Sequence, residues 1–211
     1  MNHLRRLAAL LLILSAVLHP ATAQTKKWLT RGEKFHATIM NDGHPIKAAF
    51  NVWSGKEQWV SLGIGEYGQP AIDTLTAGRL VLPDSITGPD GRRYRLKGLA
   101  RASLAHCSRL SEVVLPDSLT DIGDQAFIGC TGLRQVVLPP ALYVIYPFAF
   151  RGCTHLNTIL CRCKERPRTY NDIFDEHTLQ TALLVVPAGA TAEYANSLVF
   201  GMFRYRMENY E

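Results

Sequence analysis

The 211-residue sequence lacks the short motifs that mark common enzyme active sites. It contains no GxSxG, HExxH or GxxxxGK segment, which carry nucleophilic, zinc-dependent and phosphate-binding chemistry respectively. Residues 63–68 fit the letters of a dinucleotide-binding fingerprint, but Gln69 and Pro70 follow where that motif requires a helix. We therefore expect a protein that is not an enzyme and that has no cofactor.

The sequence has only one long apolar run, at residues 7–18. Two arginines precede this run and small residues follow it, an arrangement typical of a cleaved secretory signal. The run is too short to cross a bilayer, which takes about 20 residues. We predict a signal peptide at residues 1–23 that is cleaved between Ala23 and Gln24. The mature chain would have no transmembrane segment and would be secreted, periplasmic or attached to the cell surface.

The excess of positive over negative charge is too small to indicate a nucleic-acid partner. The formal net charge is +5, and part of it comes from Arg5 and Arg6 in the predicted signal peptide. The mature chain therefore carries only a mild positive excess, which gives no general attraction for nucleic acid. We expect no nucleic-acid binding.

The sequence does contain a 23-residue period. Its most regular copies, LSEVVLPDSLTDIGDQAFIGCTG and LRQVVLPPALYVIYPFAFRGCTH, begin at Leu110 and Leu133, and another copy begins at Leu156. A repeat of this length is typical of a solenoid, in which each unit forms one turn and stacks on its neighbours. A single unit cannot bury its apolar face alone, so both ends of the stack need a cap.

Two further units are irregular. Residues 80–85 repeat the motif of residues 113–118 at an offset of 33, and a turn signal at residues 88–91 lies in the extra length. We predict a short hairpin inserted in this unit. A degenerate unit lies within residues 161–181, with Phe174 at the buried aromatic position.

These units closely resemble the BspA-like leucine-rich repeats of bacterial surface proteins, in which a unit reads roughly LxxVxIPxSVxxIGxxAFxGC. The match is nearly complete over residues 110–130 and weakens in the next unit, where Tyr146 and Pro147 replace the expected glycine and its neighbour. The resemblance covers residues 71–211. It implies a secreted or cell-surface module for protein–protein interaction, with a role in adhesion or in envelope organisation.

The predicted fold class is a leucine-rich repeat solenoid, of the α/β class but mostly β, with short helical turns. Alternating residues before the repeats predict an N-terminal cap of antiparallel β-strands over 35–39, 46–53 and 58–60. This β-meander would cover the first repeat.

The other end of the stack is predicted to close with a strand and a short helix. The strand covers residues 184–189, and the helix covers residues 191–195 with Thr191 as its N-cap. The predicted organisation is a signal peptide at 1–23, an N-terminal cap at 24–70, leucine-rich repeats at 71–180 and a C-terminal cap at 181–211.

Alternation along the repeat strands predicts a candidate binding surface on the open sheet. If Val113 and Leu115 face the core, Val114 faces outward. Contiguous exposed apolar surface often marks a partner site. The predicted surface consists of Val81, Val114, Val137, Leu160 and Val185, flanked by Glu112, Gln135 and Thr158. We expect a protein partner there, such as a host matrix or bacterial surface component, or a second copy of the chain in a dimer. The alternatives are that β-branched residues simply favour strands, or that a local segment covers the row.

Basic residues gather in two places that follow repeat strands and predict a second candidate surface. Both places should lie along one edge of the stack, about 15 Å apart. This edge would bind a polyanion such as an anionic glycan, with Tyr94 and Tyr170 as stacking partners, or it is simply a solvated rim. Its other members are Arg92, Arg93, Arg95, Arg162, Lys164, Arg166 and Arg168.

The five cysteines are predicted to be unpaired, although secretion exposes a chain to an oxidising compartment. Cys107, Cys130 and Cys153 occupy equivalent positions in neighbouring units, so their side chains point in parallel and their Cβ atoms stay too far apart for a disulfide. Cys161 should also lie in the core, whereas Cys163 should be more accessible. The cysteine and histidine spacings match no compact metal-ligand pattern, and we expect no metal site.

Overall fold

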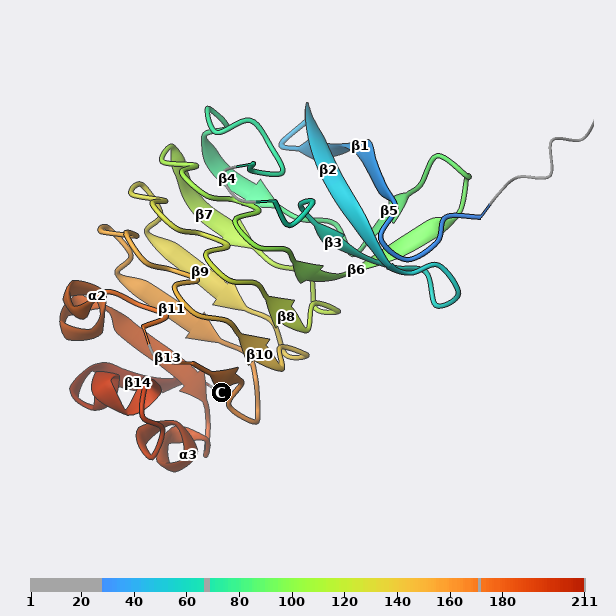
Figure 1. The fold of residues 1–211 in the computed structure, drawn as a ribbon. Coiled ribbons are helices and arrows are strands. Elements are labelled where there is room, and N and C mark those ends of the chain that lie inside the picture. The colour runs from blue at the N-terminus through green and yellow to red at the C-terminus, as the bar shows by residue number, and fades with distance from the viewer. Residues whose placement is uncertain (1–27, 67–68, 171, 211) are drawn as a thin grey trace, which may run out of the picture.

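Strands dominate the computed structural model, which describes residues 28–66, 69–170 and 172–210 (Figure 1). The predicted signal peptide and its cleavage site lie outside these residues. The described strands form two sheets, and most strand pairs between repeat units are parallel. No helix in the described ranges is long and apolar enough to cross a membrane.

One of the two sheets, which we call sheet B, takes one strand from each successive repeat unit and ends with two strands of the C-terminal segment. Its order is β14-β13-β11-β9-β7-β4, and all of its pairs are parallel. Val113, Val136, Ile159 and Leu184 are aligned across four of these strands and are fully buried. Each such side chain contributes about 1.5 to 3 kcal/mol relative to an exposed one. The strands are β4 (Gly78–Val81), β7 (Leu110–Val114), β9 (Gln135–Leu138), β11 (Thr158–Cys161), β13 (Leu183–Pro187) and β14 (Met207–Tyr210).

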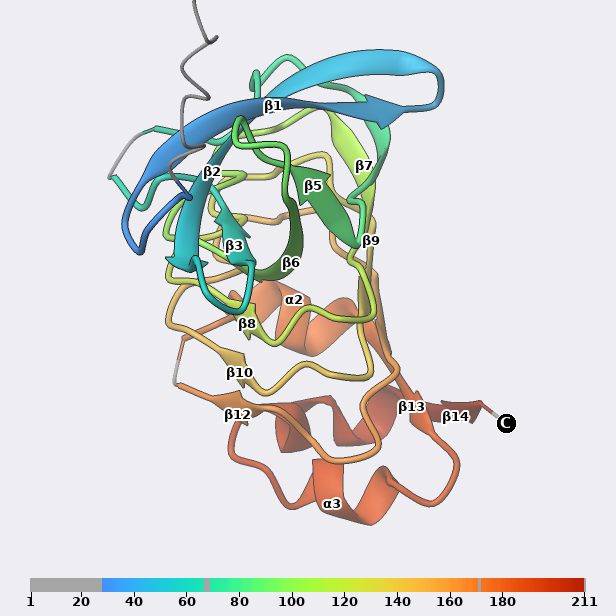
Figure 2. The ribbon, with the colours of Figure 1, turned by 90° about the vertical axis from the view of Figure 1, so that its right-hand side faces the viewer.

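The other sheet, which we call sheet A, joins the N-terminal strands to the repeats. The three strands predicted before the repeats are confirmed as β1 (Lys34–Asn41), β2 (His44–Ser54) and β3 (Trp59–Leu62), which pair antiparallel. The strand β3 then pairs in parallel with β6 (Arg93–Leu99), and the sheet continues through the short strands of later units. Figure 2 shows β8, β10 and β12 along one side of the molecule and β7, β9 and β13 along the other. The short strands are β8 (Asp121–Ile122), β10 (Val144–Ile145) and β12 (Arg168–Thr169).

The ten-residue insertion forms the predicted hairpin. Its first strand, β5 (Ser85–Thr87), pairs antiparallel with the start of β6. Asp90 holds the turn, because its carboxylate accepts hydrogen bonds from the backbone N–H of Arg92 (3.1 Å) and from the hydroxyl of Tyr94 (2.7 Å). A buried carboxylate is stable only when its oxygens have such partners.

A third side of each repeat unit is held by backbone hydrogen bonds between successive turns. The N–H of Leu104 donates to the carbonyl of Ala126 at 2.8 Å, and the N–H of Phe127 donates to that of Ala149 at the same distance. A residue with positive φ recurs in these turns, at Ala102, Gln125, Phe148 and Asp172. The repeat therefore fixes a backbone conformation even where the side chain at that position changes.

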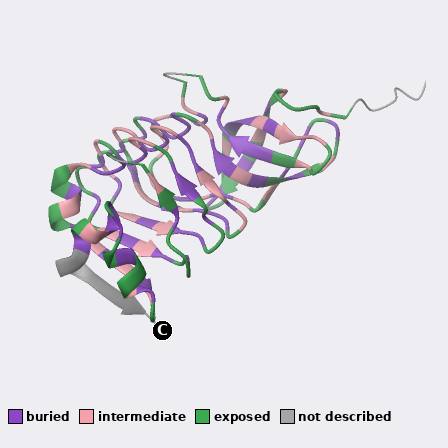
Figure 3. Ribbon diagram, turned by 60° about the horizontal axis from the view of Figure 1, so that its bottom comes forward, coloured by how far each residue is buried: buried purple, intermediate pink, exposed green. Residues whose placement is uncertain are grey.

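Stacked aromatic rings run through the core of the repeats. The ring of Phe150 lies 4.9 Å from that of Phe127 and 5.3 Å from that of Phe174, which confirms the buried aromatic position predicted for Phe174. The N-terminal strands share the same core, because Phe35 stacks on Phe50 and lies 6.0 Å from Tyr94. Buried and partly exposed residues alternate along the strands in Figure 3.

The C-terminal segment contains more helix than the sequence predicted. The helix α2 (Glu176–Thr181) falls within the degenerate unit. The helix α3 (Thr191–Ala195) confirms the predicted helix, but its N-cap is Ala190 and Thr191 is the first helical residue, so the predicted cap is wrong. A 3-10 helix, η1 (Phe200–Arg206), precedes β14.

Candidate partner-binding face

The outer face of sheet B carries a row of five aliphatic side chains, which we call the aliphatic row. Alternation along each strand places them opposite the buried positions, and all five are partly exposed. The strand register pairs each member directly with the next one. The row consists of Val81, Val114, Val137, Leu160 and Val185. It crosses four strand spacings and is therefore about 19 Å long.

A second row, which we call the polar row, runs beside the aliphatic row. Glu112, Gln135 and Thr158 are paired in register and partly exposed, so the structure brings them together as predicted. At one end the guanidinium Nε of Arg79 lies 3.2 Å from Oε1 of Glu112. At the other end Thr158 pairs with the apolar residue Leu183 of β13, so the polar row ends there. The face thus combines an apolar strip with neutral and charged hydrogen-bonding groups.

The outer edge of β4 is blocked by a side chain from β1. The buried amide of Asn41 donates from Nδ2 to the carbonyl of Arg79 (2.6 Å) and accepts at Oδ1 from the N–H of Val81 (2.9 Å). A free strand edge would allow a partner to add a strand. Because Asn41 satisfies these backbone groups, strand addition at this edge is blocked.

The predicted basic edge occupies the two ends of the repeat part of sheet A. The strands β6 and β12 are three steps apart in that sheet, as the sequence predicted. Several arginines there already have partners: Arg92 lies 3.5 Å over the ring of Trp28, Arg168 lies 4.8 Å over that of Tyr143, and Arg162 pairs with Asp117 at 2.7 Å. All basic members of this edge except Arg92 are exposed. Arg162 is paired with a carboxylate, whereas Arg92 and Arg168 keep their charge against aromatic rings. The polyanion site therefore stays a prediction.

The two tyrosines predicted to stack with an anionic ligand have different environments. Tyr94 is fully buried and donates its hydroxyl to Asp90, so its predicted role as a stacking partner is wrong. Burial, together with that hydrogen bond, raises the pKa of Tyr94 to about 12. Tyr170 is half exposed and stacks on Tyr146 at 5.6 Å.

All five cysteines are buried and form no disulfide. The thiol of Cys153 donates to the carbonyl of Phe127 at 3.2 Å, and burial raises the pKa of Cys107 and of Cys153 to about 12. Cys163 is only 1% exposed and donates to the carbonyl of Pro139, so the predicted accessibility of Cys163 is wrong. Thiols are reactive as thiolates, and those of Cys107 and Cys153 are therefore inert near neutral pH.

Two groups of aromatic side chains come together on the surface, and of their members only Tyr170 was predicted as a site residue. Tyr143, Tyr146 and Tyr170 lie around a pocket on the face of sheet A, together with Arg166 and Arg168. The three tryptophans also come together, at the N-terminal strands. The number and spacing of aromatic residues in the sequence do not predict these groups. Each ring belongs to a different segment, and only the fold brings them together.

Comparison with known proteins identifies the repeat. Residues 95–184 match the BspA type leucine rich repeat region, in six copies. No curated protein matches the chain. Leucine-rich repeat modules typically provide extended surfaces for binding other proteins.

Comparison with solved structures finds bacterial leucine-rich repeat proteins, of which one reaches a TM-score above 0.5. One from Bacteroides capillosus is 20% identical, with a TM-score of 0.51 over 71% of this chain and 97% of that one. One from T. pallidum is 22% identical, with a TM-score of 0.43 over 72% of this chain and 50% of that one. A leucine rich cell surface protein from Faecalibacterium prausnitzii is 18% identical, with a TM-score of 0.49 over 72% of this chain and 37% of that one. Residues 95–184 of this chain are thus a BspA type leucine rich repeat region.

Proposed function

We propose that this protein is a binding module that holds a protein partner on the outer face of sheet B. The observation that carries the proposal is the aliphatic row, five partly exposed side chains paired in register across consecutive strands. Exposed apolar surface of this continuity is costly in water unless a partner covers it. The polar row beside it supplies the hydrogen-bonding rim that protein interfaces have around an apolar centre.

A protein fits this face better than a small molecule does. The face is about 19 Å long, and small ligands instead favour concave sites that enclose most of their surface. The blocked edge of β4 favours a partner that docks through side chains. Both features point to a folded partner.

The place of action follows from the predicted signal peptide at residues 1–23, which would deliver the chain to the periplasm, the cell surface or the exterior. There the repeats would form a solenoid, capped by residues 24–70 at one end and by residues 181–211 at the other. The partner would be a host matrix component or a bacterial surface component, in adhesion or in envelope organisation. A module of this kind needs no enzymatic activity.

Affinity capture with a face variant tests the proposal. The purified protein and its Val114→Glu/Val137→Glu variant are incubated with host matrix and bacterial envelope extracts, and the captured proteins are identified. Each substitution places a charge in the centre of the apolar strip, and burying an unpaired charge is strongly unfavourable. We expect the variant to lose at least one partner that survives washing in about 0.5 M salt, since an apolar contact is little screened.

A matched control adds the same charges elsewhere in the same units. Thr131→Glu/Thr154→Glu has the same 23-residue spacing and lies in exposed turns before β9 and β11. This variant should capture every partner that the unsubstituted protein captures. If the face variant also captures every partner at equal yield, the sheet-face proposal is wrong. If the only partner is a second copy, light scattering will show a dimer that the face variant converts to a monomer.

A further inference from the structure

All three tryptophans of the chain line one surface groove beside the N-terminal strands. Trp28, Trp53 and Trp59 surround a cavity of about 660 Å³. A second cavity of about 800 Å³ adjoins it and shares Glu57 and Trp59 with it. The two cavities form a continuous surface feature, which we call the tryptophan groove, and it lies apart from the aliphatic row.

The fold builds this groove from segments that are distant in the sequence. Trp53 is near the end of β2 and Trp59 begins β3, where it pairs with Arg95 of β6. The indole of Trp53 packs against Gly98, where any Cβ would clash with the ring. Glycine at this position therefore allows the ring to lie on the backbone of β6.

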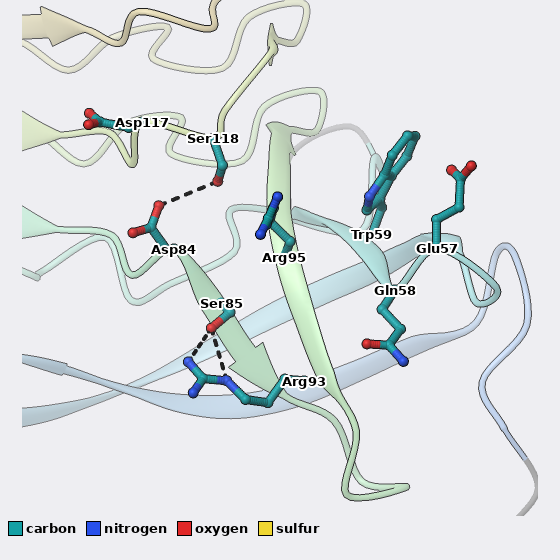
Figure 4. Close-up of a pocket in the computed structure, with 9 residues that line it drawn as sticks. All are labelled: Glu57, Gln58, Trp59, Asp84, Ser85, Arg93, Arg95, Asp117 and Ser118. Atoms are coloured by element: carbon teal, nitrogen blue, oxygen red, sulfur yellow. Dashed lines mark hydrogen bonds between the residues drawn. The ribbon is translucent and has the colours of Figure 1, made fainter.

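The second cavity has walls that both donate and accept hydrogen bonds (Figure 4). Asp84 and Ser118 lie on one side and Trp59 on the other, with Arg95 between them. Ser118 donates to Asp84 and Arg93 donates to Ser85, so these four side chains are already positioned. The guanidinium of Arg95 and the amide of Gln58 make no side-chain hydrogen bond to the other residues drawn there, and can therefore serve a ligand.

Charge of both signs lines the second cavity. Its lining includes the carboxylates of Glu57, Asp84 and Asp117 and the guanidiniums of Arg93 and Arg95. Two more cations contact the lining from outside: Arg162 pairs with Asp117 at 2.7 Å, and Nζ of Lys97 donates to the carbonyl of Ser118 at 2.9 Å. Interspersed carboxylates, cations and neutral polar groups suit a neutral ligand with many hydroxyl groups better than an anion, which the carboxylates would repel.

We propose that the tryptophan groove binds a neutral oligosaccharide. Nζ of Lys97 lies 5.6 Å from the centre of the Trp59 ring and occupies one side of it. One sugar ring would lie with its C–H face on the other side of this indole, because an aromatic face is electron-rich and apolar. Its hydroxyls would reach Asp84, Arg95 and Gln58, and the next ring would extend toward Trp28 and Trp53. A groove for a proline-rich peptide would present aromatic rings with few charges, and the carboxylates here argue against that occupant and against an anionic glycan.

Calorimetry with defined probes tests this proposal. The purified protein is titrated with neutral hexasaccharides of glucose, of mannose and of N-acetylglucosamine, and separately with a heparin hexasaccharide and with deca-proline, each up to about 5 mM. We expect at least one neutral hexasaccharide to bind. Trp59→Ala should weaken that binding at least about tenfold, whereas Tyr143→Ala, which removes an exposed ring from sheet A, should leave it unchanged.

A second variant keeps the test valid if Trp59→Ala does not fold. Arg95 is exposed and lies between the two walls, so Arg95→Ala should fold normally and weaken the same binding about three- to tenfold. Circular dichroism checks the fold of each variant. The proposal is overturned if no neutral hexasaccharide binds, if heparin or deca-proline binds in preference, or if the folded variants bind like the unsubstituted protein. The Val114→Glu/Val137→Glu variant should keep saccharide binding, which separates this proposal from the partner on sheet B.

Discussion

The repeat region and the N-terminal region build their surfaces in different ways. In the repeats each unit adds one copy of the same contact, so Val114, Val137 and Leu160 form a row and Phe127 and Phe150 form a stack. In the N-terminal strands and the inserted hairpin each contact occurs once, as in the hydrogen bond between Tyr94 and Asp90. The result is a long, uniform face in one region and a groove of mixed chemistry in the other.

The difference shows what repetition can and cannot produce. A repeated unit places like side chains side by side, and that arrangement suits an extended interface. A groove needs unlike groups at close range, which here come from a β-hairpin, an insertion and the first repeats. Interruptions of the period are therefore the places where this fold gains a site for a small ligand.

A substitution in the aromatic stack of the repeats should lower the free energy of unfolding the most. Phe150 is fully buried between Phe127 and Phe174, so Phe150→Ala leaves a cavity that both neighbours border. We expect a loss of about 3 to 5 kcal/mol in the free energy of unfolding, measured by urea denaturation. Leu198→Ala, at a side chain that is 87% exposed, should cost about 0.5 kcal/mol or less. A loss below about 1 kcal/mol for Phe150→Ala would show that the repeats do not depend on the stack.

The hydrogen bond in the insertion should show a smaller and more local effect. Tyr94→Phe removes one of the partners of the Asp90 carboxylate, which is only 7% exposed. We expect a loss of about 1 to 3 kcal/mol, and faster hydrogen exchange confined to residues 85–95. Tyr170→Phe is the control, since its ring is half exposed. Uniformly faster exchange across the repeats would contradict the local character of the N-terminal contacts.

The ion pair at the end of the polar row should show the smallest effect. The side chains of Arg79 and Glu112 are 49% and 30% exposed, so solvent screens their attraction. Arg79→Ala should lower the free energy of unfolding by about 0.2 to 1 kcal/mol, and by less in high salt. Thermal unfolding at two salt concentrations measures this, with Glu112→Ala completing a double-mutant cycle. A loss above about 2 kcal/mol in the free energy of unfolding would mean that residues on the outer face of sheet B stabilise the fold, in addition to being available for a partner.

Two features that differ from the predictions are nevertheless encoded in local patterns of the sequence. Arg93 and Arg95 alternate with Tyr94, so the strand that exposes the arginines must turn Tyr94 inward, and the same alternation turns Cys163 inward with Cys161. The predicted role of Tyr94 and the predicted accessibility of Cys163 are wrong because both residues follow this alternation into the core. Thr191 is different, because a helix can begin one residue earlier or later without any change in pattern.

The sequence by itself determined the repeat, the strands and the rows of side chains on sheet B. These depend on the 23-residue period and on two-residue alternation, which act between neighbours in the chain and between successive units. Only the tertiary structure decided which basic residues are paired and which aromatic rings meet. Arg162 finds Asp117, and Trp28 joins Trp53 and Trp59, across separations that no local pattern describes. Such contacts depend on how the N-terminal strands and the insertion pack on the first repeats, and packing of that kind occurs only once in the molecule.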